Sequence, residues 1–163
     1  MLQAVDKLSE WIGKGVAWLI PLLILELVYD TAARYLFNTA TGWSYDVSYM
    51  LYGAIFMLGA SHTLVRDGHV RIEIIYHRVS PRARALIDAL GYLLLYLPAM
   101  GALLYFGLGF ALKSWRMGET SGASMWSPPI YPFKAVLPLA AFLLLLQGTV
   151  NLIRCLQTFF RRG

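Results

Sequence analysis

Three charged side chains, Glu26, Asp30 and Arg34, recur every four residues inside an otherwise apolar segment. Side chains four residues apart lie on the same side of an α-helix, so these three would form one stripe. Such a stripe could relay ions or substrate, or it could join two helices through hydrogen bonds and ion pairs. The helix contact is favoured, because Arg34 can neutralise Asp30 and because Asp46 starts the next apolar run at the same membrane face.

Other signs of catalysis or of a bound cofactor are weak. The histidines, His62, His69 and His77, lie at or beyond the end of one apolar run. Haem inside a helical bundle normally needs ligands from facing helices. The single cysteine, Cys155, cannot form an internal disulfide, and there is neither a phosphate-binding glycine loop nor a zinc-spaced Cys and His set. We therefore expect no enzymatic activity, no cofactor and no metal in this chain.

The composition indicates a membrane protein. Hydrophobic residues make up 58% of the 163 residues, charged residues only 14%, and the mean hydropathy is +0.58. A soluble domain typically carries about 25% charged residues. The net charge of +5 does not indicate a nucleic-acid partner, because Lys and Arg cluster beside apolar runs and form no continuous stripe. We expect a single membrane domain over residues 1–163, with lipids as its surroundings.

Four apolar segments predict an all-α integral membrane protein with four transmembrane helices. About 20 residues are needed to cross a hydrocarbon core of about 30 Å. The uncharged runs at 47–65 and 135–153 have 19 residues each, the run at 89–112 has 24, and the first segment is interrupted by the charged stripe. Pro98 should bend the third span. The predicted spans are approximately 12–37, 47–66, 86–113 and 133–156.

The connections between these spans are also informative. The sequence RIEIIYHR at 71–78 predicts a short amphipathic helix in the membrane interface. The segment at 118–132 is rich in Gly, Ser and Pro, which predicts an irregular loop.

The distribution of Lys and Arg predicts the orientation of the chain. Ten of them flank the spans on the side of the two termini and the middle connection, and four lie on the opposite side. Cytoplasmic connections of membrane proteins carry the excess of Lys and Arg. We therefore expect both termini in the cytoplasm and a multi-pass location in a bacterial or archaeal inner membrane.

An ordered set of short motifs resembles the small membrane subunit of tripartite ATP-independent periplasmic (TRAP) transporters. The motifs are RYLFN at 34–38, Trp43 with Asp46, LGA at 58–60 and GHVRIE at 68–73. The family often has Glu where this chain has Asp46 and Asp where it has Glu73, so both positions keep their charge. The resemblance extends over essentially the whole chain.

This resemblance implies a scaffold subunit that packs one-to-one against a large membrane subunit. A periplasmic binding protein would deliver a carboxylate solute, and the large subunit would hold the substrate and sodium. Residues Glu26, Asp30, Arg34, Trp43 and Asp46 would then serve structure or the subunit interface.

Two further groups of residues are expected to contact partners. His69, Arg71 and Glu73 belong to the GHVRIE motif, which is predicted to lie in the cytoplasmic loop. Glu119, Trp126 and Tyr131 lie in or beside the longest periplasmic connection, and their mixture of charge and aromatic rings suits a transient interface. We expect these three to dock the binding protein.

Two other functions remain open. A small four-helix exporter could use Glu26 as a titrating carboxylate in a dimer, although Arg34 and the long outer loop argue against it. A membrane anchor of a redox enzyme would bind quinone or haem.

Overall fold

The computed structural model describes residues 2–39, 41–65 and 81–161. These residues are helical, apart from their connections and an isolated antiparallel bridge between Thr120 and Pro129. The predicted all-α class is therefore confirmed for the described part of the chain. The interfacial helix predicted at 71–78 lies outside the described residues.

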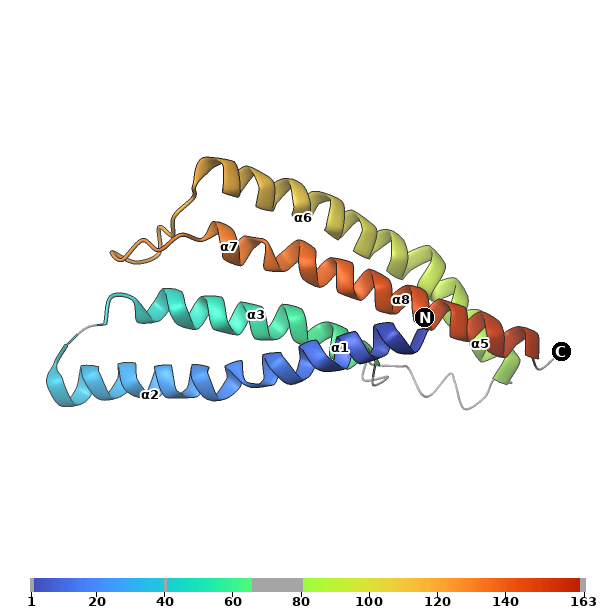
Figure 1. The fold of residues 1–163 in the computed structure, drawn as a ribbon, viewed down its shortest axis with the longest axis horizontal. Coiled ribbons are helices and arrows are strands. Elements are labelled where there is room, and N and C mark those ends of the chain that lie inside the picture. Colours follow the sequence, from blue (N-terminus) through green and yellow to red (C-terminus); the bar gives the residue numbers. More distant parts are fainter. Residues whose placement is uncertain (1, 40, 66–80, 162–163) are drawn as a thin grey trace.

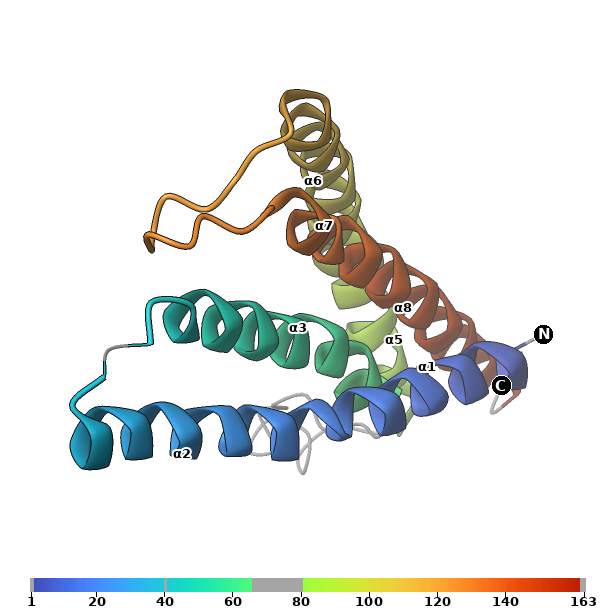
Figure 2. The same ribbon diagram turned by 60° about the vertical axis from the view of Figure 1, so that its left-hand side comes forward.

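The helices form two antiparallel groups (Figure 1). In one group, α1 and α2 follow each other almost in line and α3 returns beside them; in the other, α5, η1 and α6 form a long rod against which α8 packs. The two groups meet at the end that carries both termini and diverge toward the other end (Figures 1 and 2). The bounds are α1 Leu2–Ala17, α2 Leu19–Phe37, α3 Ser44–Val65, α5 Pro81–Gly91, the π-helix η1 Tyr92–Tyr96, α6 Leu97–Met117, α7 Tyr131–Lys134 and α8 Val136–Arg161.

Prolines explain where the helical rods are interrupted. Proline lacks an N–H, and its ring clashes with the carbonyl group four residues earlier. Pro21 follows the break between α1 and α2, Pro98 follows η1, and Pro138 follows the break between α7 and α8. The residues just before Pro98, where a bend was predicted, form a π-helix, which is a common way to absorb an irregularity within an α-helix.

Helix α8 is the centre of the packing, because it contacts α1, α3, α5 and α6. Small residues allow these close approaches, as is common between helices in membranes. Ala141 is fully buried, and a Cβ atom added to Gly148 would lie only 2.3 Å from the Tyr96 ring. In the same way, a Cβ atom on Gly53 of α3 would lie 2.5 Å from the ring of Phe133 in α7.

Three helical segments in the described part of the chain are long and apolar enough to cross a membrane. They are Gln3–Phe37, Ala83–Met117 and Tyr131–Phe160. The predicted spans at 12–37, 86–113 and 133–156 lie within these segments. Helix α3, where the span at 47–66 was predicted, has 22 residues but also carries Asp46, Ser61 and His62. It is not among these three segments, and its role as a fourth span stays a prediction.

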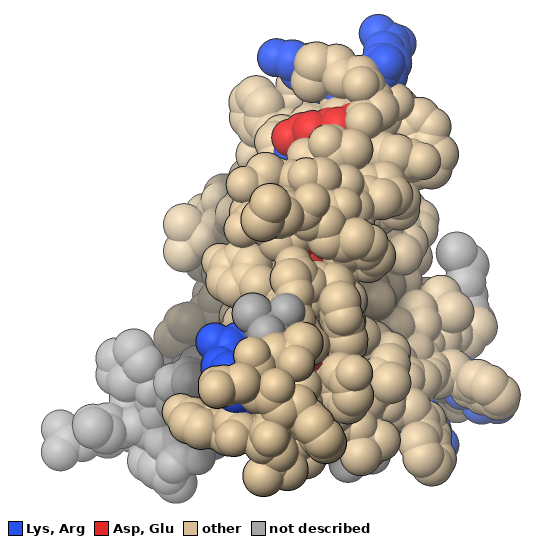
Figure 3. Space-filling view, turned by 90° about the vertical axis from the view of Figure 1, so that its left-hand side faces the viewer, with Lys and Arg blue, Asp and Glu red and all other residues tan. Residues whose placement is uncertain are grey.

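The outer surface of the helices is unusually apolar. Most large hydrophobic side chains of α2 and α6 are exposed, among them Leu25, Val28, Tyr105 and Phe106. Figure 3 shows a face on which charged atoms occupy small areas near its edges and in shallow gaps. A surface of this kind is suited to lipid or to another membrane subunit.

Candidate functional site

Glu26 joins α2 to α3. Its side chain is buried, with 8% of the residue surface exposed. One carboxylate oxygen accepts a hydrogen bond from the Ser44 hydroxyl, and the other accepts one from the Ser48 hydroxyl at 2.5 Å. Glu26 therefore contacts a neighbouring helix and does not face lipid, as the membrane-buried position of this stripe predicts.

Asp30 and Arg34 lie farther along the same side of α2. The Arg34 guanidinium donates to Asp30 at 2.9 Å, and the Thr41 hydroxyl donates to the second oxygen of Asp30. Beside them, the rings of Tyr29 and Trp43 stack with centroids 5.9 Å apart. These contacts close the turn between α2 and α3. Arg34 therefore forms an ion pair with Asp30.

Asp46 connects α3 to the long loop between α6 and α7. Only 1% of its surface is exposed, and its two oxygens accept hydrogen bonds from the hydroxyls of Ser121 and Ser124. These serines lie 75 and 78 positions farther along the chain. The acidic residue near Trp43 therefore holds the loop against the end of α3. We call the contact of Asp46 with Ser121 and Ser124 the loop anchor.

The same loop is also fixed to its own flanking helices. The peptide N–H of Ile130 donates to the Glu119 carbonyl at 3.0 Å, and that of Ser121 donates to the Pro128 carbonyl at 2.8 Å. The Lys134 ammonium group donates to the Glu119 carboxylate at 2.5 Å and lies 4.3 Å from the centre of the Phe110 ring. The hydrogen bond and charge of Lys134 hold the pKa of the Glu119 carboxyl below its usual range.

The three predicted docking residues differ in their exposure. Trp126 is 54% exposed at the tip of the loop, whereas Tyr131 is partly buried and packs edge-on against Trp115 with centroids 4.8 Å apart. Glu119 is engaged with Lys134. Met125, next to Trp126, is fully exposed and was not among the residues predicted from the sequence. Met125 and Trp126 are therefore the large apolar side chains that the loop exposes.

A second polar cluster, also not predicted, joins α1 to α8 near the termini. Gln147 is fully buried; its amide nitrogen donates to Asp6 at 2.9 Å, and its oxygen accepts from the Ser9 hydroxyl at 3.3 Å. Arg154 forms an ion pair with Asp6. The signal in the sequence was the amide of Gln147 within an apolar run, since a buried amide needs hydrogen-bond partners. We call these four residues the terminal cluster.

Neither the loop anchor nor the terminal cluster resembles a catalytic or metal site. No group of three or more His, Cys, Asp or Glu side chains suited to a metal occurs among residues 2–39, 41–65 and 81–161. The carboxylates are instead bonded to hydroxyl, amide and guanidinium groups of the same chain. The predicted motif residues His69, Arg71 and Glu73 lie outside the described residues.

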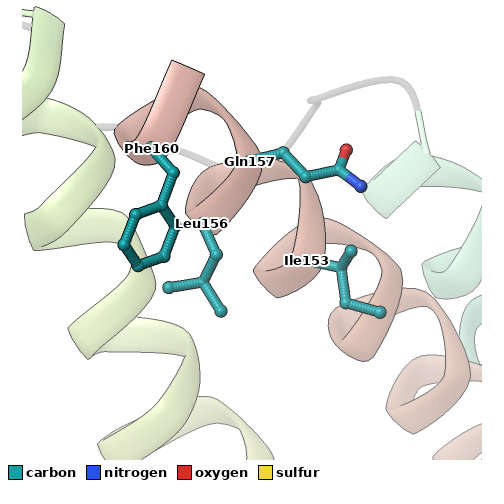
Figure 4. A pocket seen from close by; sticks show the side chains of 4 residues that line it. All are labelled: Ile153, Leu156, Gln157 and Phe160. Atoms are coloured by element: carbon teal, nitrogen blue, oxygen red, sulfur yellow. The ribbon is translucent and has the colours of Figure 1, made fainter. Parts of the chain in front are cut away.

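Hollows on the described part of the surface include open grooves. One of about 540 Å³ lies at the end of α8 and is lined by Ile153, Leu156, Gln157 and Phe160 (Figure 4). Another of about 430 Å³ lies between α6 and α8 and has an apolar lining that includes Trp115 and Phe142. Among the described residues that line them, neither groove has a charged side chain.

A family model described as tripartite ATP-independent periplasmic transporters, DctQ component, matches residues 23–158. The matched region contains Glu26, Asp30, Arg34 and the loop anchor, whereas α1 lies before it. Among curated proteins, no match to the chain was found.

Proposed function

The chain belongs to the DctQ component family of tripartite ATP-independent periplasmic transporters, and on that premise we propose that it serves as the scaffold for the large transport subunit. Membership makes it the small membrane subunit of a transporter and not an enzyme. In the proposed role, its apolar outer surface packs against the large subunit and stabilises that subunit in the membrane.

The observation that carries this proposal is the internal pairing of the buried carboxylates. Glu26 is bonded to Ser44 and Ser48, and Asp46 is bonded to Ser121 and Ser124. A transport site must offer polar groups to a solute or ion and then release it. These groups instead bond to their own chain, which supports a structural role for them.

The remaining parts of the transport cycle are assigned to the partners. We propose that a periplasmic binding protein delivers an organic acid with a carboxylate group, and that the large subunit imports this solute with sodium. The small subunit would pair with the large one in a one-to-one complex. Sodium would bind in the large subunit, so that this chain needs no cofactor.

The proposed topology has four spans, with α3 as the second, and both termini on the cytoplasmic side of an inner membrane. The two termini lie at the same end of the molecule, as an even number of spans requires (Figure 1). In this arrangement the connection between α6 and α7 faces the periplasm, where Met125 and Trp126 would meet the binding protein.

Reconstitution into vesicles tests the scaffold role. The chain alone should take up no organic acid under a sodium gradient, even with the binding protein present. With the large subunit it should purify as a one-to-one complex, and that complex should be active. Sodium-driven uptake or export by the lone chain would contradict the proposal and favour the exporter.

A further inference from the structure

Helix α1 has one face fixed to the rest of the protein. Asp6 and Ser9 belong to the terminal cluster with Gln147 and Arg154 of α8. Farther along the helix, Gly13 packs so closely against His62 of α3 that a Cβ atom would lie 2.4 Å from its ring. These contacts set the rotation of α1 about its own axis, and therefore which side chains face outward.

The outward face of α1 carries alternating cations and indole rings. Lys7, Trp11, Lys14 and Trp18 are spaced by four, three and four residues, which places them on one side of the helix and its junction with α2. All four are exposed, and Trp11 and Trp18 are each 78% exposed. No ion pair joins Lys7 or Lys14 to any acidic residue in the described part of the chain. We call these four residues the Lys–Trp stripe.

Helix length places this stripe beside the hydrocarbon core and not within it. The 19 residues of α2 extend about 28 Å at 1.5 Å per residue, nearly the full thickness of about 30 Å. Trp18 therefore lies at the boundary where α2 leaves the core, and α1 continues into the headgroup region. Trp is enriched at this boundary, and lysine avoids the large cost of entering the core.

We propose that the Lys–Trp stripe binds anionic phospholipid headgroups at the membrane surface beside the two termini. The lysines complement the lipid phosphates, the Trp18 ring occupies the boundary between headgroups and acyl chains, and the Trp11 ring lies farther out among the headgroups. Of the acidic residues of α1, Asp6 is paired with Arg154 and Glu10 is half-buried beside the stripe, so the exposed charge of this face is positive. The inference concerns α1, which precedes the family match, and it does not depend on the transport role.

Quenching by brominated lipids tests this inference. The full chain is reconstituted in mixed vesicles of phosphatidylcholine and phosphatidylglycerol, with bromine on one lipid at a time. The fluorescence difference between the unmodified chain and W11F/W18F reports on the stripe. We expect brominated phosphatidylglycerol to quench this difference signal more than brominated phosphatidylcholine at low salt. The preference should fall by up to about fivefold for each lysine removed in K7Q/K14Q, and it should weaken in high salt.

Matched variants at the opposite end of the molecule serve as controls. K113Q/R116Q removes two exposed cations from the end of α6, and it should leave the lipid preference of the stripe unchanged. Equal quenching by the two lipids, or a preference that survives K7Q/K14Q, would overturn the inference. Absence of quenching by both lipids would also overturn it, because protein would then cover the stripe.

Discussion

Glu26 and Asp46 are both buried acidic residues whose partners are serine hydroxyls. A carboxylate only accepts hydrogen bonds, and a serine hydroxyl donates one, so each carboxylate oxygen is matched to one donor. Removing either carboxylate would leave one buried and one partly buried hydroxyl without an acceptor, and an unpaired buried group typically costs about 1–3 kcal/mol. The two residues thus stabilise contacts between segments that are distant in the sequence.

Substitution of Glu26 separates the structural role from a titrating relay. Glu26→Gln keeps an acceptor oxygen and the shape of the side chain, but it cannot titrate. We expect this variant to assemble with the large subunit and to transport at a near-normal rate. Glu26→Leu removes the acceptors, so the yield of the complex should fall. Loss of uptake by the Gln variant in a correctly assembled complex would show that Glu26 takes part in transport chemistry.

Gly148 is required by the close approach of Tyr96. Gly148→Ala would place a methyl group 2.3 Å from the Tyr96 ring, and such overpacking typically costs about 1–3 kcal/mol. We expect a lower midpoint of thermal unfolding in detergent. Gly101→Ala is the matched control, because a Cβ atom added to Gly101 would have no neighbouring atom within 4 Å. If the two variants have equal midpoints, Tyr96 does not pack against Gly148 as described.

Among the elements, the loop between α6 and α7 is held in part by an ion pair that salt and pH can alter. Because the pKa of Glu119 is lowered, its pairing with Lys134 stabilises the loop at pH values above the ordinary Glu pKa of about 4.3. The stabilisation is lost as the pH falls through the lowered folded-state pKa. We expect proteolysis of the loop to accelerate only as the pH falls through this lowered pKa. The acceleration at acidic pH should be absent in Glu119→Gln.

A charge swap checks the same pair at neutral pH. Glu119→Lys places two cations together and should increase proteolysis of the loop. The double variant E119K/K134E restores an ion pair and should return the rate toward that of the unmodified chain. Failure of the swap to restore protection would mean that Glu119 acts through a group other than Lys134.

The tip of this loop is predicted to contact the binding protein through Met125 and Trp126. M125A/W126A removes the exposed apolar side chains while leaving Glu119 and the loop anchor in place. We expect unchanged assembly with the large subunit but at least several-fold weaker stimulation of uptake by the binding protein. Uptake that responds to the binding protein as before would exclude this docking surface.

A helix could be predicted from the sequence where the residues of its own segment determine it. Uncharged runs located the long apolar helices, because length and hydropathy are local properties. The packing of helix α1 was not predicted, and the predicted first span begins only at residue 12, within this helix. Its support comes from Gln147 and Arg154, more than a hundred positions away. Likewise, the acidic residue Asp46 was identified from the sequence, but its serine partners were not.

In the whole molecule, the loop anchor and the terminal cluster lie at opposite ends. The anchor joins α3 to the outer loop, where the two helix groups diverge, and the terminal cluster joins α1 to α8, where they meet (Figure 2). Between these ends, α8 packs against α3. Polar bonds at both ends therefore fix the angle between the helix groups, which a scaffold for another membrane subunit requires.

The topology of the whole chain is the last prediction. Ten Lys and Arg on the side of the termini against four on the other side favour cytoplasmic termini, because basic residues resist translocation. This requires α3 to cross the membrane despite its polar residues. Much of their cost is offset within the protein, since Asp46 is bonded to two serines and Ser61 is bonded to the Leu58 carbonyl. Reporter fusions after residues 40, 75, 122 and 163 should therefore read outside, inside, outside and inside. If α3 did not cross, the fusion after residue 75 would read outside, and both the four-span topology and the periplasmic position of Met125 and Trp126 would be wrong.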